Sequence, residues 1–83
     1  MLDQNEATIR TKIRAFITRE LIRDEEYTLE NDESLINDGL MDSFSLAELA
    51  VYVNDTFDVY IPDADLTVEK MDTLDQIIAR VMQ

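Results

Sequence analysis

A chain of 83 residues is long enough for one domain with one modest core, and we expect residues 1–83 to form a single domain. The hydrophobic fraction of 46% is sufficient for folding, while one Gly and one Pro favour helices over turn-rich β structure. The net charge of −12 argues against nucleic acid as a partner, because its phosphates would be repelled.

The location of the protein is indicated by what the sequence lacks. There is no cysteine, so no disulfide can form, which fits a reducing cytoplasm. No apolar run approaches the roughly 18 residues of a membrane span, and the N-terminus has no signal-peptide segment. We expect a cytoplasmic monomer without a membrane span.

The charges are unevenly distributed along the chain. Five of the seven basic residues lie in the first 23 positions, whereas residues 24–69 contain fourteen carboxylates and no base. Such a run is either a solvated surface or a docking surface for basic partners. The sequence leaves both interpretations open.

The first apolar stripe predicts a helix over about residues 5–23. The stripe consists of Ile9, Ile13, Phe16 and Ile17. Asp3 with Glu6 resembles a capping box at its start. Glu20 falls on the stripe and Ile22 falls off it, so the last turn does not follow the pattern.

Residues 24–42 show no periodicity and are rich in Asn, Asp and Glu. We expect a long loop in which Leu29, Leu35 and Ile36 contact the core. A loop of this length in a small domain is uncommon unless it has a function.

A second helix is predicted from Asp42 or Ser43 as the N-cap to about Phe57. Its core-facing stripe consists of Leu46, Leu49, Ala50, Val53 and Phe57.

Two further helices complete the predicted fold. Pro62 fits the first turn of a short helix over about residues 60–66, with Leu66 contacting the core. Thr73 and Gln76 suggest a capping box that opens a final helix. The inward residues of that final helix are Leu74, Ile77, Ile78 and Val81. Three main helices, one short helix and a long first loop predict an all-α, small four-helix bundle.

Most catalytic chemistry is excluded by composition. Without histidine or cysteine there is no nucleophile–imidazole pair and no usual zinc site. A calcium loop from Asp58 to Glu69 fails, because Tyr60 and Pro62 fall where ligands belong. A single glycine cannot build a phosphate-binding loop. We expect neither an enzyme nor a metal site.

Ser43 stands at the start of the second helix without a base to activate it, so covalent chemistry on it would require another protein. The simplest interpretation is a helix cap. At about 100° per residue, however, an apolar strip edged by acids faces away from the core beside this serine, which is typical of a partner site. This strip consists of Phe44, Ala47, Glu48, Val51 and Asp55.

The segments DSFSLAELAVYVNDTFDVYIPDADL and TLDQIIARV resemble the acyl carrier proteins, from about Leu35 to Val81. The motif of that family is Asp-Ser followed by an apolar residue, with Glu five positions after the serine. Its downstream pattern is F-D-x-x-I-P-x-x-D. The matching residues here are Asp42, Ser43, Phe44, Glu48, Phe57, Asp58, Ile61, Pro62 and Asp65.

The resemblance implies a four-helix bundle in which Ser43 carries 4′-phosphopantetheine, attached from coenzyme A by a phosphopantetheinyl transferase. The thiol of this arm would hold an acyl or aminoacyl group as a thioester. Asp42 would help to present the arm and the metal of the transferase. An acyl- or aminoacyl-adenylating ligase, synthase or transferase would dock on a face made of Asp42, Phe44, Ala47, Glu48, Val51 and Asp55.

Some positions depart from carriers of fatty acid synthesis. Phe44 stands where those carriers usually have Leu, and Ser45 stands where they commonly have an acid. Of the acidic cluster that they carry late in this helix, only Asp55 is present. These departures resemble stand-alone carriers that work with adenylate-forming ligases, such as D-alanyl carriers. The alternative is an acidic helical adaptor without a prosthetic group. In that case Ser43 is only a helix cap, and Phe44 is only an exposed apolar residue that contacts a partner.

Overall fold

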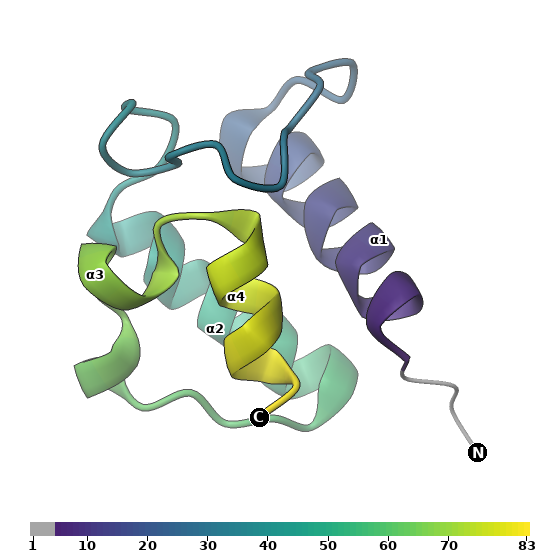
Figure 1. Ribbon diagram of the computed structural model, residues 1–83, viewed down its shortest axis with the longest axis vertical. Coiled ribbons are helices and arrows are strands. Elements are labelled where there is room, and N and C mark those ends of the chain that lie inside the picture. The colour runs from purple at the N-terminus through teal and green to yellow at the C-terminus, as the bar shows by residue number, and fades with distance from the viewer. Residues whose placement is uncertain (1–4) are drawn as a thin grey trace.

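The computed structural model describes residues 5–83, which form helices and loops and contain no strand. The elements are α1 (Glu6–Phe16), η1 (Ile17–Ile22), α2 (Ser43–Phe57), η2 (Asp63–Asp65), α3 (Val68–Met71) and α4 (Leu74–Val81). Helices α1 and α4 pack against each other, and the long loop crosses the top of the bundle in Figure 1. The predicted all-α, small four-helix bundle is confirmed.

The first helix begins one residue later than predicted and changes its geometry near its end. Asn5 is the N-cap, and its side chain accepts a hydrogen bond from the Thr8 N–H at 2.9 Å. The cap expected at Asp3 lies outside the described residues. Beyond Phe16 the chain continues as the π-helical segment η1, where the N–H of Arg23 bonds to the carbonyl of Thr18.

The π-helical segment accounts for the mismatch in the apolar stripe. Hydrogen bonds from i to i+5 widen each turn, so the residue one turn after Ile17 is Ile22. Glu20 is accordingly exposed, while Ile22 is half-buried against the core. The π-helical segment thus removes an acid from the core face.

The core lies where the four helices and the loop meet. Its apolar residues are Ile9, Ile13, Ile17, Leu29, Leu35, Met41, Leu46, Leu49, Val53, Phe57, Ile61, Met71, Leu74, Ile77, Ile78 and Val81. The predicted contacts of Leu29 and Leu35 are therefore confirmed, and Ile36 packs half-buried beside them. Ala50, expected on the inward stripe of α2, is also only half-buried.

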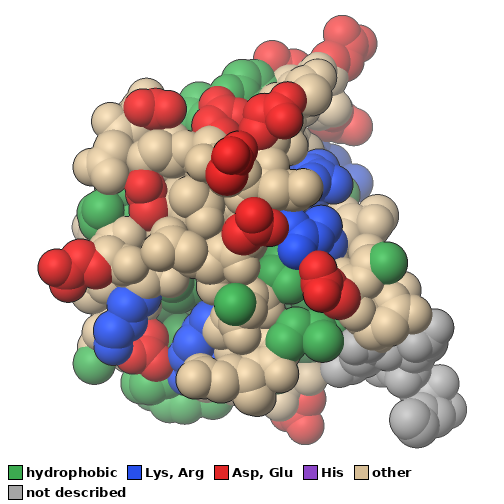
Figure 2. All heavy atoms as spheres, in the orientation of Figure 1, with side chains coloured by type: hydrophobic (Ala, Val, Ile, Leu, Met, Phe, Trp, Pro, Cys, Tyr) green, Lys and Arg blue, Asp and Glu red, His purple; other side chains and the backbone are tan. Residues whose placement is uncertain are grey.

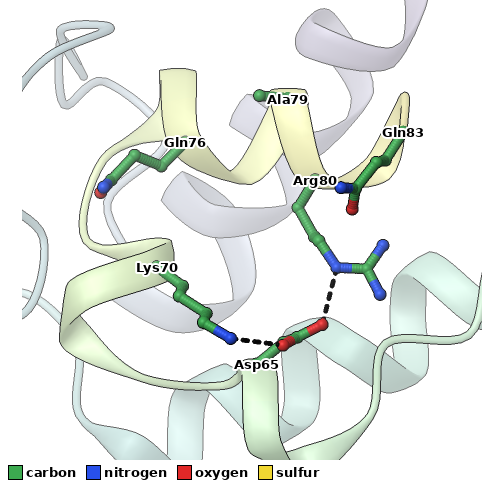
Figure 3. Close-up of a pocket in the computed structure, with 6 residues that line it drawn as sticks. All are labelled: Asp65, Lys70, Gln76, Ala79, Arg80 and Gln83. Carbon is green, nitrogen blue, oxygen red and sulfur yellow. Dashed lines mark hydrogen bonds and ion pairs between the residues drawn. The ribbon is translucent and has the colours of Figure 1, made fainter.

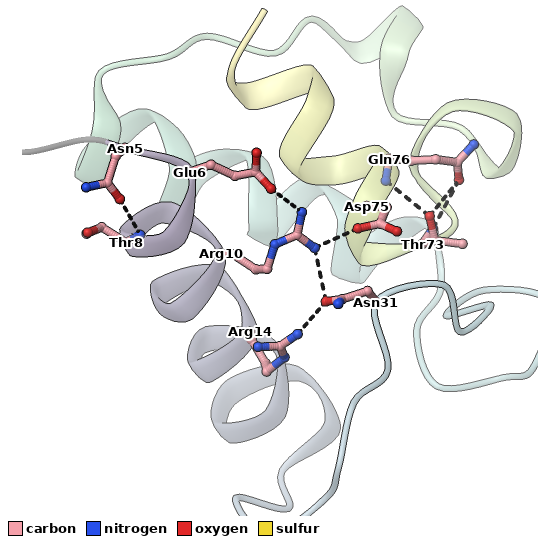
Figure 4. A network of polar contacts seen from close by, with 9 residues as sticks. All are labelled: Asn5, Glu6, Thr8, Arg10, Arg14, Asn31, Thr73, Asp75 and Gln76. Atoms are coloured by element: carbon pink, nitrogen blue, oxygen red, sulfur yellow. Dashed lines mark hydrogen bonds and ion pairs between the residues drawn. The ribbon is translucent and has the colours of Figure 1, made fainter.

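A polar network joins α1, the loop and α4, as Figure 4 shows. The Arg10 guanidinium donates to Glu6 at 2.7 Å, to Asp75 at 2.6 Å and to the Asn31 side chain at 3.0 Å. Arg14 donates to the same Asn31 oxygen. These ion pairs and hydrogen bonds raise the pKa of Arg10, with Glu6 the largest cause. The network fixes the middle of the long loop, at Asn31, to both helices.

The segment after α2 differs from the prediction. Pro62 is the N-cap of η2, with an extended ψ of 155°, and does not lie within the first turn. A helical turn that the sequence did not predict, α3, follows Thr67, whose side chain accepts from the N–H of Lys70. Leu66 is half-buried against the core.

Asp65 fastens this segment to the rest of the bundle (Figure 3). Its carboxylate accepts from Lys70 Nζ and from Arg80 Nε, each at 2.9 Å. These two hydrogen bonds, the one from Lys70 being the larger cause, lower the pKa of Asp65. The short segment η2 is thereby tied to α3 and α4.

The last helix agrees with the prediction. Thr73 is its N-cap, and the reciprocal capping box with Gln76 is formed. In Figure 2 acidic side chains spread over the loop at the top, and basic side chains lie lower, toward α1 and α4. Within residues 5–83 no helix has the length and apolarity that crossing a membrane requires.

Candidate functional site

Ser43 is the first residue of α2, and Asp42 is the N-cap. The Asp42 carboxylate accepts from the Ser45 N–H at 2.9 Å and from the Ser45 hydroxyl at 3.1 Å. Of the two N-cap candidates, Asp42 fills the role, so the interpretation of Ser43 as the helix cap is wrong.

The two serines at this helix start are in different situations. Ser43 is exposed, and its hydroxyl makes no hydrogen bond to any residue in the range 5–83. Ser45 is half-buried, and its hydroxyl is bonded to Asp42. Of the two hydroxyls, that of Ser43 is the one open to an incoming reagent.

Asp42 remains ionised at neutral pH beside this hydroxyl. The backbone N–H of Ser45, followed by the Ser45 hydroxyl, lowers the pKa of the Asp42 carboxyl. A carboxylate at a helix N-terminus is also favoured by the helix dipole. A fixed negative charge therefore lies one residue before Ser43.

The end of the long loop determines where Ser43 is held. The N–H groups of Leu40 and Met41 bond to the carbonyl of Leu35 at 2.8 and 2.9 Å. Gly39 adopts a φ of 84°, which glycine reaches without a steric cost. Met41 is buried only two residues before Ser43. The hydroxyl is thus exposed on a well-anchored stretch of backbone.

Two residues that shape this region, Met41 and Asp72, were not predicted from the sequence. Met41 stands alone between a glycine and the helix start, so no periodicity marks it. Asp72 accepts hydrogen bonds from the loop around Ile36, a relation that local sequence cannot indicate. Its position directly before the Thr73 capping box was the only local signal.

The outward face of α2 has the orientation that its spacing predicts. Phe44 is 73% exposed and Val51 is 61% exposed. Ala47, Glu48 and Asp55 are exposed on the same side of the helix. The structure therefore brings all of these residues into one surface that begins beside Ser43.

Tyr60 extends this surface and was not part of the prediction. It is 72% exposed, and it lines a groove of 260 Å³ together with Ala47 and Val51 of α2. An exposed apolar surface of this kind favours contact with another molecule.

No catalytic arrangement accompanies Ser43. Histidine and cysteine are absent from the chain. In the described range, 5–83, no three acidic side chains are grouped so that they could hold a metal ion.

No protein-family model matches the chain. Over 57 residues it is 30% identical to the D-alanyl carrier protein of Lactobacillus acidophilus, an alignment that covers 69% of this chain and 72% of the relative. The chain belongs to the acyl carrier protein family, among the stand-alone carriers. It therefore has a carrier role, with enzymes as partners, and is not itself an enzyme.

Proposed function

We propose that Ser43 carries a covalent 4′-phosphopantetheine arm and that residues 1–83 form one carrier domain. The observation that carries the proposal is the exposed hydroxyl of Ser43, which has no hydrogen-bond partner among residues 5–83 and lies next to a cap, Asp42, that does not use it. The competing hydroxyl, that of Ser45, is engaged by Asp42.

The residues around Ser43 fit a phosphodiester. A phosphate on Ser43 would lie at the N-terminus of a 15-residue helix, where the dipole favours negative charge. Asp42 would add an ionised oxygen ligand for the metal ion of a phosphopantetheinyl transferase. When bound, the arm supplies the thiol that holds cargo as a thioester.

The proposed cargo is an aminoacyl or other acyl group loaded by an adenylating ligase. The relative's name specifies D-alanyl, which makes D-alanine the first cargo to test. The ligase or a later transferase would dock on the face of α2, through Phe44, Ala47 and Val51 with Glu48 and Asp55 at its edge.

Intact mass tests the attachment site. Incubation with coenzyme A and a broad-specificity transferase should add one phosphopantetheine to the wild type and none to Ser43→Ala. Ser45→Ala is the matched control and should still be modified. Modification that persists in Ser43→Ala would show that the site is wrong, and an unmodified wild type would favour the adaptor.

A further inference from the structure

Asp72 lies in the short connection between α3 and α4, and its carboxylate faces the last part of the long loop. One oxygen accepts from the backbone N–H groups of Ile36 and Asn37, at 2.9 and 3.3 Å. The other accepts from the Ser34 hydroxyl and from the side-chain amide of Asn37, the latter at 3.1 Å. A carboxylate has about four acceptor positions, so this one is fully occupied by the loop.

The backbone of Asp72 strengthens the same junction. Its carbonyl accepts from the N–H of Leu35 at 2.7 Å, and its N–H donates to the side-chain oxygen of Gln76 at 2.9 Å. Gln76 belongs to the capping box that begins α4. Asp72 is therefore held by α4, and it in turn binds residues 34–37 through both its side chain and its backbone.

Residues 34–37 lead to Ser43 through few hydrogen bonds. The carbonyl of Leu35 accepts from the N–H groups of Leu40 and Met41. The side chains of Leu35 and Met41 are both buried. Asp42, the N-cap of α2, follows Met41 directly. The backbone that presents Ser43 is thus fixed on one side by α2 and on the other by the turn that Asp72 binds.

Transfer of the arm depends on where the Ser43 hydroxyl lies. In this transfer, Ser43 Oγ forms a bond to the coenzyme A phosphorus that bears the pantetheine. The bond from that phosphorus to the bridging oxygen breaks and releases the adenosine bisphosphate half, while the hydroxyl proton passes to a base of the transferase. Reacting atoms must approach to about 3–3.5 Å in good alignment, and a misplacement of about 1 Å can cost about a hundredfold in rate.

We propose that Asp72 is a positioning residue for this transfer, because the turn that it binds holds the Ser43 hydroxyl in place. This inference rests on the proposed function, since it specifies what keeps Ser43 ready for the transferase. Asp72 acts through Leu35 and Met41, and the outward face of α2 is separate from this path. Loss of the Asp72 hydrogen bonds should therefore slow the chemical step and leave binding of the transferase nearly unchanged.

Kinetics of arm transfer to the unmodified chain test the proposal. In Asp72→Asn an amide nitrogen replaces one oxygen, so two of the four hydrogen bonds from the loop to this side chain lose their acceptor. With coenzyme A saturating, the kcat of a broad-specificity transferase should fall about threefold or more, and its KM for the carrier should change little. Ser34→Ala removes one of these hydrogen bonds, so kcat should fall less.

Asn31→Ala is the matched control, because it also releases the loop from the helices, but at a point before Leu35. It removes the hydrogen bonds that Arg10 and Arg14 donate to the Asn31 side chain (Figure 4). This variant should be less stable than wild type and should keep the wild-type kcat. Circular dichroism at the assay temperature shows that each variant is folded.

Hydrogen exchange on the unmodified chain locates the effect in the loop. In Asp72→Asn the amide protons of Leu40 and Met41 should exchange about threefold faster or more, because the turn that contains their acceptor, the carbonyl of Leu35, is held less firmly. The same protons should be accelerated less in Asn31→Ala. Equal acceleration in the two variants would contradict a specific role of Asp72.

The kinetic outcomes separate this inference from the proposed function. A kcat of Asp72→Asn equal to that of wild type, or an equal fall in Asp72→Asn and Asn31→Ala, would overturn the positioning role alone. A rise in KM at constant kcat would also overturn it, since the substitution would then act on docking. A wild type that accepts no arm would overturn the proposed function and this inference with it.

Discussion

The carboxylate of Asp72 accepts a hydrogen bond from the backbone N–H of Ile36 at 2.9 Å, across 36 positions of the chain. The same carboxylate accepts from the Ser34 hydroxyl and from the backbone and side-chain N–H groups of Asn37. One ionised residue before α4 therefore organises the loop that leads to Ser43.

We expect Asp72→Asn to destabilise the fold, because an amide cannot accept as many or as strong hydrogen bonds as a carboxylate. Loss of these bonds should lower the free energy of unfolding by about 1–3 kcal/mol. Urea denaturation followed by circular dichroism measures the change. Asp63→Asn, at an exposed position, is the control and should change stability by less than about 0.5 kcal/mol. Equal effects of the two substitutions would contradict the organising role of Asp72.

Acid should destabilise the protein in a defined range of pH. Partial burial opposes ionisation of Asp72, but hydrogen bonds from Ser34, Ile36 and Asn37 outweigh it and lower the pKa of Asp72 below its ordinary 3.8. The pKa values of Asp42 and Asp65 are lowered as well. A carboxyl whose pKa is lower in the folded state stabilises that state above its unfolded pKa.

The stability contributed by these three carboxylates is therefore lost as the pH falls below about 4. Thermal melts from pH 7 to pH 2.5 should therefore show a decline in Tm below about pH 4. A Tm that rises continuously to pH 3 would show that repulsion outweighs these hydrogen bonds.

Salt should stabilise the chain. Fourteen carboxylates occupy residues 24–69 without a base, and screening of their repulsion should raise Tm. The Debye length falls from about 30 Å at 0.01 M to about 8 Å at 0.15 M, so most of the rise should occur in that interval. Magnesium should have a larger effect than sodium at equal ionic strength if carboxylates cluster. A Tm indifferent to both ions would indicate that the arginines of α1 already neutralise the acidic surface.

Substitutions on α2 should separate apolar contact from charge in docking. Val51→Asp places a charge in the centre of the proposed contact, where an unpaired buried charge costs on the order of 2–5 kcal/mol. It should slow loading by the adenylating ligase severely and leave the fold intact, because Val51 is 61% exposed. Glu48→Gln alone leaves Asp55 in place, so its effect should be smaller and should decrease as salt rises.

Loading rates of the two variants decide between these contributions, with circular dichroism as the folding control. A greater loss for Glu48→Gln than for Val51→Asp at physiological salt would mean that docking is mainly electrostatic.

Features that depend on near neighbours could be predicted from the amino-acid sequence. Apolar residues at helical spacing defined α1, α2 and α4, and the Thr73–Gln76 capping box marked where α4 begins. The outward orientation of Phe44 and Val51 followed from 100° per residue. Each of these features is fixed by residues within a turn or two, so a linear pattern contains enough information to predict it.

Features that join distant segments could not be predicted in this way, because they depend on how the chain folds. The π-helical segment η1 brings Ile22 into contact with the core. Helix propensity alone would predict a continuous α-helix at these residues. The hydrogen bond from Ile36 to Asp72 and the stacking of Phe16 on Tyr52 each join residues that lie 36 positions apart. Such contacts form only when folding brings the elements together, because their free energy depends on geometry that no local pattern encodes.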